Sequence, residues 1–173
     1  MNKNLAKNKK TKKYRAGSKK AALTNSTIHF ALENWCKGSF YRKDIEKAYG
    51  NISDWDVSKV TKMKGLFKDK KFFNEKIENW DVSNVTDMSN MFDGAFDFNQ
   101  PLEKWDVSKV EYMSSMFRNA EKFNQPLEKW NVSNVTYMRS MFWSAKEFNQ
   151  NIKDWDVSNV EVSPAGFRSM FGG

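Results

Sequence analysis

Residues 80–104 read WDVSNVTDMSNMFDGAFDFNQPLEK, and this stretch is one copy of a tandem repeat with a period of 25 residues. Tryptophan begins each copy, and valine, phenylalanine and asparagine recur in step with it. A fixed period of this length is typical of proteins in which each copy forms one turn of a stack. The recurring positions are Trp55, Trp80, Trp105, Trp130 and Trp155; Val57, Val82, Val107, Val132 and Val157; Phe67, Phe92, Phe117, Phe142 and Phe167; and Asn74, Asn99, Asn124 and Asn149.

The apolar spacing changes within one copy. Trp80 and Val82 are two residues apart, which predicts a short extended segment with both side chains on one face. The spacing after Val85 is that of a short helix, with an apolar stripe formed by Val85, Met88, Met91, Phe92 and Ala95. The sequence therefore predicts an α/β repeat, an LRR-like solenoid with a short strand and a short helix in each turn. We expect the Trp, Val, Met and Phe columns to point inward.

Across its copies the chain carries the string F-N-Q-P-L-x-x-W-D-V-S-N-V-T-x-M-x-x-M-F. This string resembles the repeat of the BspA-like leucine-rich repeat surface proteins, and the resemblance runs from about Thr27 to the end of the chain. It implies an LRR-like solenoid with binding or adhesion roles. It implies no catalytic residue, since the family motif contains none.

Three segments are expected: a disordered basic tail over residues 1–26, a helical N-terminal cap over 27–52, and a solenoid over 53–173 with four full repeats and one truncated repeat. In the cap, Ser39 is the expected N-cap of the second helix, and Gly50 follows its end. The expected apolar stripes are Ile28, Ala31, Leu32 and Trp35 in the first helix, and Tyr41, Ile45 and Ala48 in the second.

The positive charge of the chain is concentrated in the tail. The chain has 29 basic and 21 acidic residues; nine of the basic residues and no acidic residue fall in the first 32 positions, which leaves 20 against 21 in the rest. One interpretation of the tail is contact with a polyanion such as nucleic acid, in a nuclear or virion-internal protein; the other is a solubilising extension. The candidate polyanion-binding residues are Lys9, Lys10, Lys12, Lys13, Arg15, Lys19 and Lys20.

Residues that support catalysis or metal binding are scarce. Cys36 is the only cysteine and His29 the only histidine, so no intramolecular disulfide and no zinc site of several Cys and His ligands can form. On one predicted helix they would lie about 10.5 Å apart along the axis, too far for a hydrogen bond. The Asp column (Asp56, Asp81, Asp106, Asp156, with Asn131) has two interpretations, a calcium ladder or local turn chemistry, and we expect the latter.

We therefore expect a non-enzymatic protein without cofactor or metal. No stretch is long and apolar enough to span a membrane, and the first residues lack the apolar run of a secretory signal. This pattern favours a location inside a cell or virion over secretion.

Two columns vary while the frame of the repeat stays constant, and their helical phase predicts that they face solvent. Tyr112 and Tyr137 occupy one of these columns, and Arg118 and Trp143 occupy the other. Exposed Tyr, Trp and Arg dominate the energetics of protein interfaces, so these four residues are the candidate surface for a protein partner. The alternative is local packing, with the tyrosines stacked on each other and Trp143 stacked on Arg118.

The last repeat departs from the others. Pro164 and Gly166 interrupt its predicted helical half. Phe167, Met170 and Phe171 then form either a minimal C-terminal cap or the contact surface of a homodimer.

Overall fold

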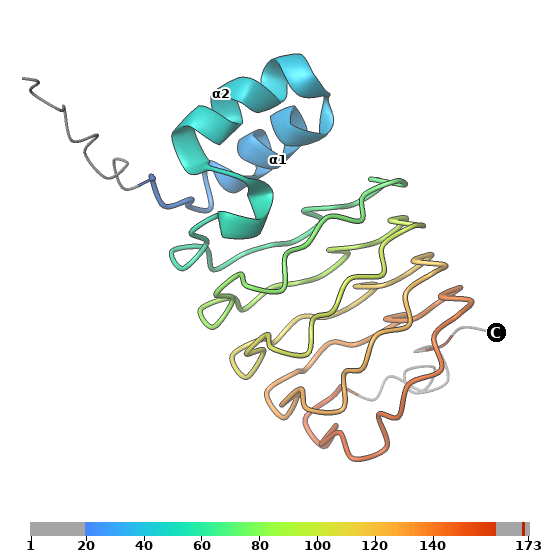
Figure 1. Cartoon of the computed structure of the whole chain (residues 1–173). Helices are drawn as coiled ribbons and strands as arrows, with labels where there is room; N and C mark the ends of the chain where they lie inside the picture. The colour runs from blue at the N-terminus through green and yellow to red at the C-terminus, as the bar shows by residue number, and fades with distance from the viewer. Residues whose placement is uncertain (1–19, 162–170, 172–173) are drawn as a thin grey trace, which may run out of the picture.

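The computed structural model describes residues 20–161 and residue 171. Two helices, α1 (Ile28–Cys36) and α2 (Ser39–Tyr49), are followed by a short 3-10 helix, η1 (Ile52–Asp54). From Trp55 onward the chain winds into a stack of similar coils, with the helices at one end of the stack (Figure 1). We number the coils by their tryptophans: coil 1 is 55–79, coil 2 is 80–104, coil 3 is 105–129 and coil 4 is 130–154.

The predicted α/β solenoid is wrong. In the described part of the coils the structure has neither an α-helix nor a strand, and both α-helices precede the repeats. Within the described residues, pairing of β type is limited to isolated parallel bridges. One joins Thr24, before the helices, to Lys59; the others connect one coil to the next and join Lys62 to Asp87, Asp87 to Tyr112, and Tyr112 to Tyr137.

The segment expected to be helical is a series of tight turns. In coil 2 the Met91 amide donates to the Met88 carbonyl, and the Ala95 amide donates to the Phe92 carbonyl, each bond closing a four-residue turn. Asn90 and Gly94, the third residues of these turns, have φ of 56° and 73°, in the left-handed region that an α-helix cannot contain. Successive turns also return every third or fourth residue to the core, which produced the helical apolar spacing.

The amide groups between these turns join neighbouring coils. The Met88 amide donates to the Tyr112 carbonyl at 2.9 Å, and the Phe92 amide donates to the Met116 carbonyl at 2.8 Å. Alternate amides thus bond within the coil and across to the next coil. Backbone groups are therefore satisfied without a regular helix or sheet.

The core consists of the repeated apolar columns, and the inward orientation is confirmed for their members in coils 1 to 4. Trp80, Trp105 and Trp130 are each 3% exposed, and Phe92 and Phe117 are fully buried. The rings of Phe67, Phe92, Phe117 and Phe142 form a continuous stack, with successive centroids 5.0, 5.4 and 5.6 Å apart. These separations are close to the spacing of hydrogen-bonded chains, so the rings stack at the same repeat as the backbone.

The buried tryptophans from Trp105 onward also link successive coils by hydrogen bonds. The Trp105 indole N–H donates to the Ile77 carbonyl at 3.2 Å, and the Trp130 indole N–H donates to the Leu102 carbonyl at 3.0 Å. A buried indole needs an acceptor, and the preceding coil supplies it.

The Asn column forms a structural ladder between coils. The Asn74 side-chain carbonyl accepts from the Asn99 amide at 3.0 Å and from the Gln100 side chain at 2.9 Å. Asn99 binds the next coil in the same way. The Asp column has the expected turn chemistry: Asp81 accepts from the amide and the hydroxyl of Ser83, at 3.1 and 2.6 Å.

The two α-helices pack against the first coil. Ile28, Ala31, Leu32 and Trp35 of α1 are buried as predicted, and the Trp35 ring meets Trp55 edge to face, with centroids 5.6 Å apart.

The prediction for α2 holds only in part. Ile45 is buried and Gly50 follows the helix with φ of 89°, as expected. Tyr41 and Ala48 are exposed, and Gly38 rather than Ser39 is the N-cap. None of the helices in the described part of the chain has the length and apolar character needed to cross a membrane.

Candidate functional site

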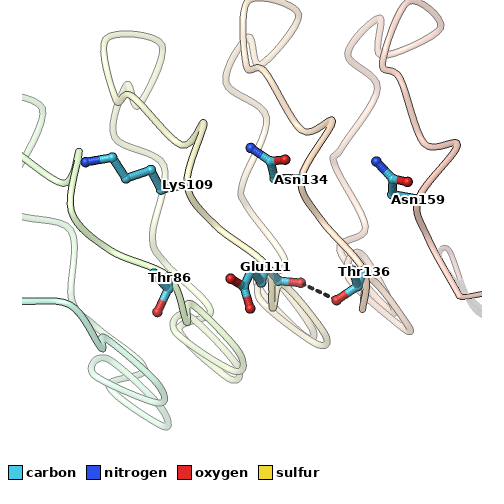
Figure 2. Close-up of a pocket in the computed structure, with 6 residues that line it drawn as sticks. All are labelled: Thr86, Lys109, Glu111, Asn134, Thr136 and Asn159. Carbon is cyan, nitrogen blue, oxygen red and sulfur yellow. Dashed lines mark hydrogen bonds between the residues drawn. The ribbon is translucent and has the colours of Figure 1, made fainter.

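A shallow groove of about 590 Å³ crosses several coils on one face of the stack. Figure 2 shows two rows of side chains along it, each taking one residue from successive coils. Neighbouring coils run in register, so equivalent residues lie side by side. The lining residues are Thr86, Lys109, Glu111, Asn134, Thr136 and Asn159.

Hydrogen bonds to the preceding coil hold one row of the groove in place. The Asn134 side-chain amide donates to the Ser108 carbonyl at 2.6 Å, and that of Asn159 donates to the Ser133 carbonyl at 2.7 Å. Lys109 Nζ donates to the Asn84 side chain at 2.9 Å. These side chains are therefore positioned before any ligand arrives.

The second row combines hydroxyl groups with a carboxylate. The Thr136 hydroxyl donates to the Glu111 backbone carbonyl at 3.2 Å, as drawn in Figure 2. The side chain of Glu111 lies between Thr86 and Thr136 in this view, so the centre of this row carries a negative charge, whereas the other row has the Lys109 ammonium group.

Two exposed tyrosines follow directly after this row. The rings of Tyr112 and Tyr137 are stacked, with centroids 5.2 Å apart and planes within 5°, and each residue is 39% exposed. The Tyr137 hydroxyl donates to Glu161 Oε1 at 2.7 Å. This hydrogen bond, together with the negative charge of Glu161, raises the pKa of Tyr137 above its ordinary value. We call the groove and these two tyrosines the groove face.

The other predicted pair behaves differently. The Arg118 guanidinium makes two hydrogen bonds to the Asp93 carboxylate, at 2.9 and 2.8 Å, and these bonds raise the pKa of Arg118. Asp93 is only 2% exposed, and Lys68 Nζ lies 3.8 Å from it. Arg118 thus pairs with Asp93, and within the described residues it makes no cation–π contact with Trp143. Trp143 is 41% exposed, and neither residue lines the groove.

Of the basic residues proposed for polyanion binding, only Lys20 is described. Its Nζ donates to the backbone carbonyls of Glu46 and Lys47, at 3.2 and 2.7 Å. Lys20 therefore caps the C-terminal end of α2, where a positive charge is favourable. Lys9, Lys10, Lys12, Lys13, Arg15 and Lys19 lie outside the described residues.

The candidate C-terminal contact is also only partly described. Phe171 stacks on Phe142, with ring centroids 5.6 Å apart, and is 53% exposed. Phe167 and Met170 lie outside the described residues, so the homodimer stays a prediction.

A second cavity, of about 370 Å³, lies where the helices meet coil 1. Glu75 accepts from the Trp35 indole at 2.9 Å and from Arg42 at 3.0 Å, and the Arg42 guanidinium lies over the Trp35 ring. Cys36 also lines this cavity; the residue as a whole is exposed, but partial desolvation of its thiol raises the pKa of Cys36. A thiol whose pKa is raised is a weaker nucleophile at neutral pH.

Residues 20–161 contain no group of three or more His, Cys, Asp or Glu side chains arranged to hold a metal ion. The sequence prediction included the tyrosines but missed the six groove residues. The signal available was the variable slot just before each tyrosine column position, which reads Thr61, Thr86, Glu111, Thr136 and Glu161.

The stacked, ladder-bonded coils define a tandem-repeat protein whose variable side chains lie on the outer face. In agreement, a family model described as "Mycoplasma protein of unknown function, DUF285" matches residues 35–136 and again residues 71–172. The chain belongs to this repeat family. Comparison with curated proteins and with solved structures found no match.

Proposed function

We propose that this chain is a non-enzymatic repeat protein that binds a protein partner through the groove face. The observation that carries the proposal is the pair of stacked, exposed tyrosines beside a groove of positioned polar side chains. Tyrosine offers large contact area with few rotatable bonds and is enriched at interface hot spots.

The rigidity of the groove face supports a binding role. Its asparagines bond the backbone of the preceding coil, and the tyrosines are held by each other and by Glu161. Pre-organised side chains lose little conformational entropy on binding, which favours affinity. The resemblance of the repeat motif to the BspA-like surface proteins points to the same kind of role.

The chemistry of the groove supports a non-enzymatic protein. Its six lining residues include one carboxylate and one ammonium group, and neither an imidazole nor a thiol. The Lys109 ammonium already donates to Asn84. No lining side chain is therefore paired with a base that could activate it as a nucleophile.

The test is capture of partners from the source organism's extract by the immobilised full chain, followed by titration with the purified partner. The double variant Tyr112→Ala/Tyr137→Ala should bind that partner about 10-fold more weakly or worse, as expected when hot-spot residues are removed. The matched control is Phe40→Ala/Phe72→Ala, which removes two aromatic rings that are 80% and 86% exposed elsewhere. Equal binding by all three forms would contradict the proposal, as would loss in the control only.

A second candidate function is polyanion binding by the N-terminal segment. The charge of the sequence favours it, since residues 1–20 contain nine basic residues and no acid. Because Lys20 caps α2, the variant that tests this function should keep Lys20 and replace Lys9, Lys10, Lys12 and Lys13 with Ala. Nucleic-acid binding that falls in this variant and weakens with added salt would support the candidate.

A further inference from the structure

The positive charge of the folded part is concentrated in coil 1. Residues 57–76 contain seven lysines and two acidic residues, whereas the equivalent residues 82–101 of coil 2 contain three acidic residues and no basic one. The net charge of the chain after the N-terminal segment is near zero, but its first coil is strongly basic and its second coil is acidic.

Three of these lysines, Lys59, Lys62 and Lys64, are exposed and fall within six positions of one another. The parallel bridge from Lys62 to Asp87 sets the register between coils 1 and 2. In that register Lys59 extends the row that contains Lys109, Asn134 and Asn159 in Figure 2. The three residues therefore lie at the coil 1 end of the groove face, and we call them the lysine cluster.

The charges of the lysine cluster are not neutralised within the fold. Lys68 and Lys70 of the same coil have carboxylate partners, Asp93 at 3.8 Å and Glu33 at 2.9 Å. Within residues 20–161, no carboxylate oxygen lies within 4 Å of the ammonium group of Lys59, Lys62 or Lys64.

The acidic residue nearest in register is Asp87, the bridge partner of Lys62. Its carboxylate accepts from the Ser89 amide at 2.9 Å, so it serves the backbone of its own coil. Asp87 lowers the positive potential on the coil 2 side of the cluster.

The basic N-terminal segment joins the fold next to the lysine cluster. The Leu23 amide donates to the Asp56 carbonyl at 2.8 Å, and Thr24 forms a parallel bridge with Lys59. Lys20, the last of the nine basic residues of positions 1–20, precedes Thr24 by four residues, so the basic segment of the sequence ends close to the point at which the chain lies against Lys59.

We propose that the lysine cluster is a phosphate-binding site for the backbone of a nucleic acid. This inference rests on the second candidate function and deepens it by placing a phosphate-binding site on the folded coils. Lysine is depleted at protein–protein interfaces, whereas lysine ammonium groups bind phosphates by displacing counterions. Between the lysines of the cluster the only exposed residue is Thr61, because Val60 and Met63 are buried; the absence of an exposed apolar side chain among residues 59–64 favours phosphate over a protein partner.

The experiment measures binding of a fluorescein-labelled single-stranded 20-nucleotide DNA by fluorescence anisotropy, with the full chain and a series of salt concentrations. The test variant is Lys59→Ala/Lys62→Ala/Lys64→Ala. The control is Lys76→Ala/Lys104→Ala/Lys153→Ala, which removes the same charge from three exposed lysines spread over the coils. A third variant replaces Lys9, Lys10, Lys12 and Lys13 with Ala, and circular dichroism verifies that all forms are folded.

If each lysine of the cluster contacts one phosphate, the negative slope of log binding constant against log salt concentration should become less steep by about 2 in the test variant. The binding constant of this variant at 0.1 M salt should be roughly 100-fold lower than that of the unmodified chain. The control should change much less. Equal losses in the test and control variants would indicate attraction by net charge only and would overturn the inference.

Two further outcomes separate the inference from the function on which it rests. A loss confined to the N-terminal variant would overturn the lysine cluster and leave the second candidate function standing. Failure of every form to bind the DNA, with binding of a polyglutamate probe of similar charge, would overturn both and indicate an acidic protein partner.

Discussion

At the residue scale, the series of tight turns in each coil depends on two residues with left-handed backbone conformation. The first of these positions carries Gly65, Asn90, Ser115 and Ser140 in successive coils, and the second carries Asp69, Gly94, Asn119 and Ser144. For residues other than glycine this conformation costs about 1–2 kcal/mol, and Asn and Asp tolerate it best. The coil-to-coil hydrogen bonds that these turns permit offset the cost.

Gly94 offers the sharpest test at this scale. Its φ is 73°, and a Cβ at this position would lie 2.7 Å from Asp69 Oδ1. Gly94→Ala should lower the free energy of unfolding by about 1–2 kcal/mol through backbone strain, and by a further amount through this contact. Urea denaturation measures the change.

Gly65 is the matched control for Gly94. Its φ is 62°, but the nearest atom to an added Cβ is Lys68 Cβ at 3.8 Å. Gly65→Ala should therefore lower the free energy of unfolding through backbone strain only. In a chain that also carries Asp69→Ala, Gly94→Ala and Gly65→Ala should lower the free energy of unfolding by similar amounts. Equal destabilisation by both alanines would show that the Asp69 contact does not matter.

At the scale of the element, the coil takes the place of the helix or strand. A single coil satisfies only part of its own backbone, because alternate amides of the turn run donate to the next coil. Side chains add to this pairing through the Asn column and the indole hydrogen bonds of the core, whereas the Asp–Ser turns bond within a single coil. The element is thus stable only as a member of a stack.

The Asn ladder can be tested at Asn99. Its side-chain carbonyl accepts from the Asn124 amide at 3.0 Å and from the Gln125 side chain at 2.8 Å. Asn99→Ala leaves both donors without this partner and should lower the free energy of unfolding by about 1–3 kcal/mol. Asn99→Asp keeps an acceptor and should lose much less, as measured by thermal and urea unfolding.

An exposed asparagine outside the ladder provides the comparison. Asn79 is exposed and lies in coil 1. Asn79→Ala should be close to neutral, within about 0.5 kcal/mol. A loss at Asn79 as large as at Asn99 would argue against the ladder as the cause.

At the scale of the whole molecule, each coil is stabilised by its contacts with the two coils next to it. The helices cover the first coil through Trp35, which is fully buried, meets Trp55 and donates its indole N–H to Glu75. In such a stack, a defect at one end should loosen the adjoining coils before the distant ones.

Trp35→Ala tests this order. The loss of a fully buried tryptophan should lower the free energy of unfolding by about 3–5 kcal/mol. Hydrogen exchange should show the greatest loss of protection in coil 1 and the smallest in coil 4. Trp143→Ala, at a site that is 41% exposed, should change little; a uniform loss of protection along the stack in Trp35→Ala would contradict nearest-neighbour coupling.

The sequence by itself determined the repeat, its period and the residues that face the core. Identical residues at Trp80, Trp105 and Trp130 are buried together because stacking places equivalent positions next to each other. The same logic accounts for the Asn ladder, since a side chain repeated at one period meets its own copy in the next coil. The first helix and the end of the second also followed from local signals, because an apolar stripe and Gly50 act within a few residues.

Only the tertiary structure decided the conformation between those columns. An apolar spacing of three to four residues fits a helix and a series of turns equally. Which of the two forms depends on the hydrogen-bond acceptors of the backbone amides, and those of Met88 and Phe92 find their acceptors in the next coil. The outer face followed the same rule: Arg118 is held by Asp93 from one coil away, whereas Lys59 and Lys62 have no such partner in the described residues. Whether a charge or ring is free to bind depends on the register of neighbouring coils, and register is a property of the stack.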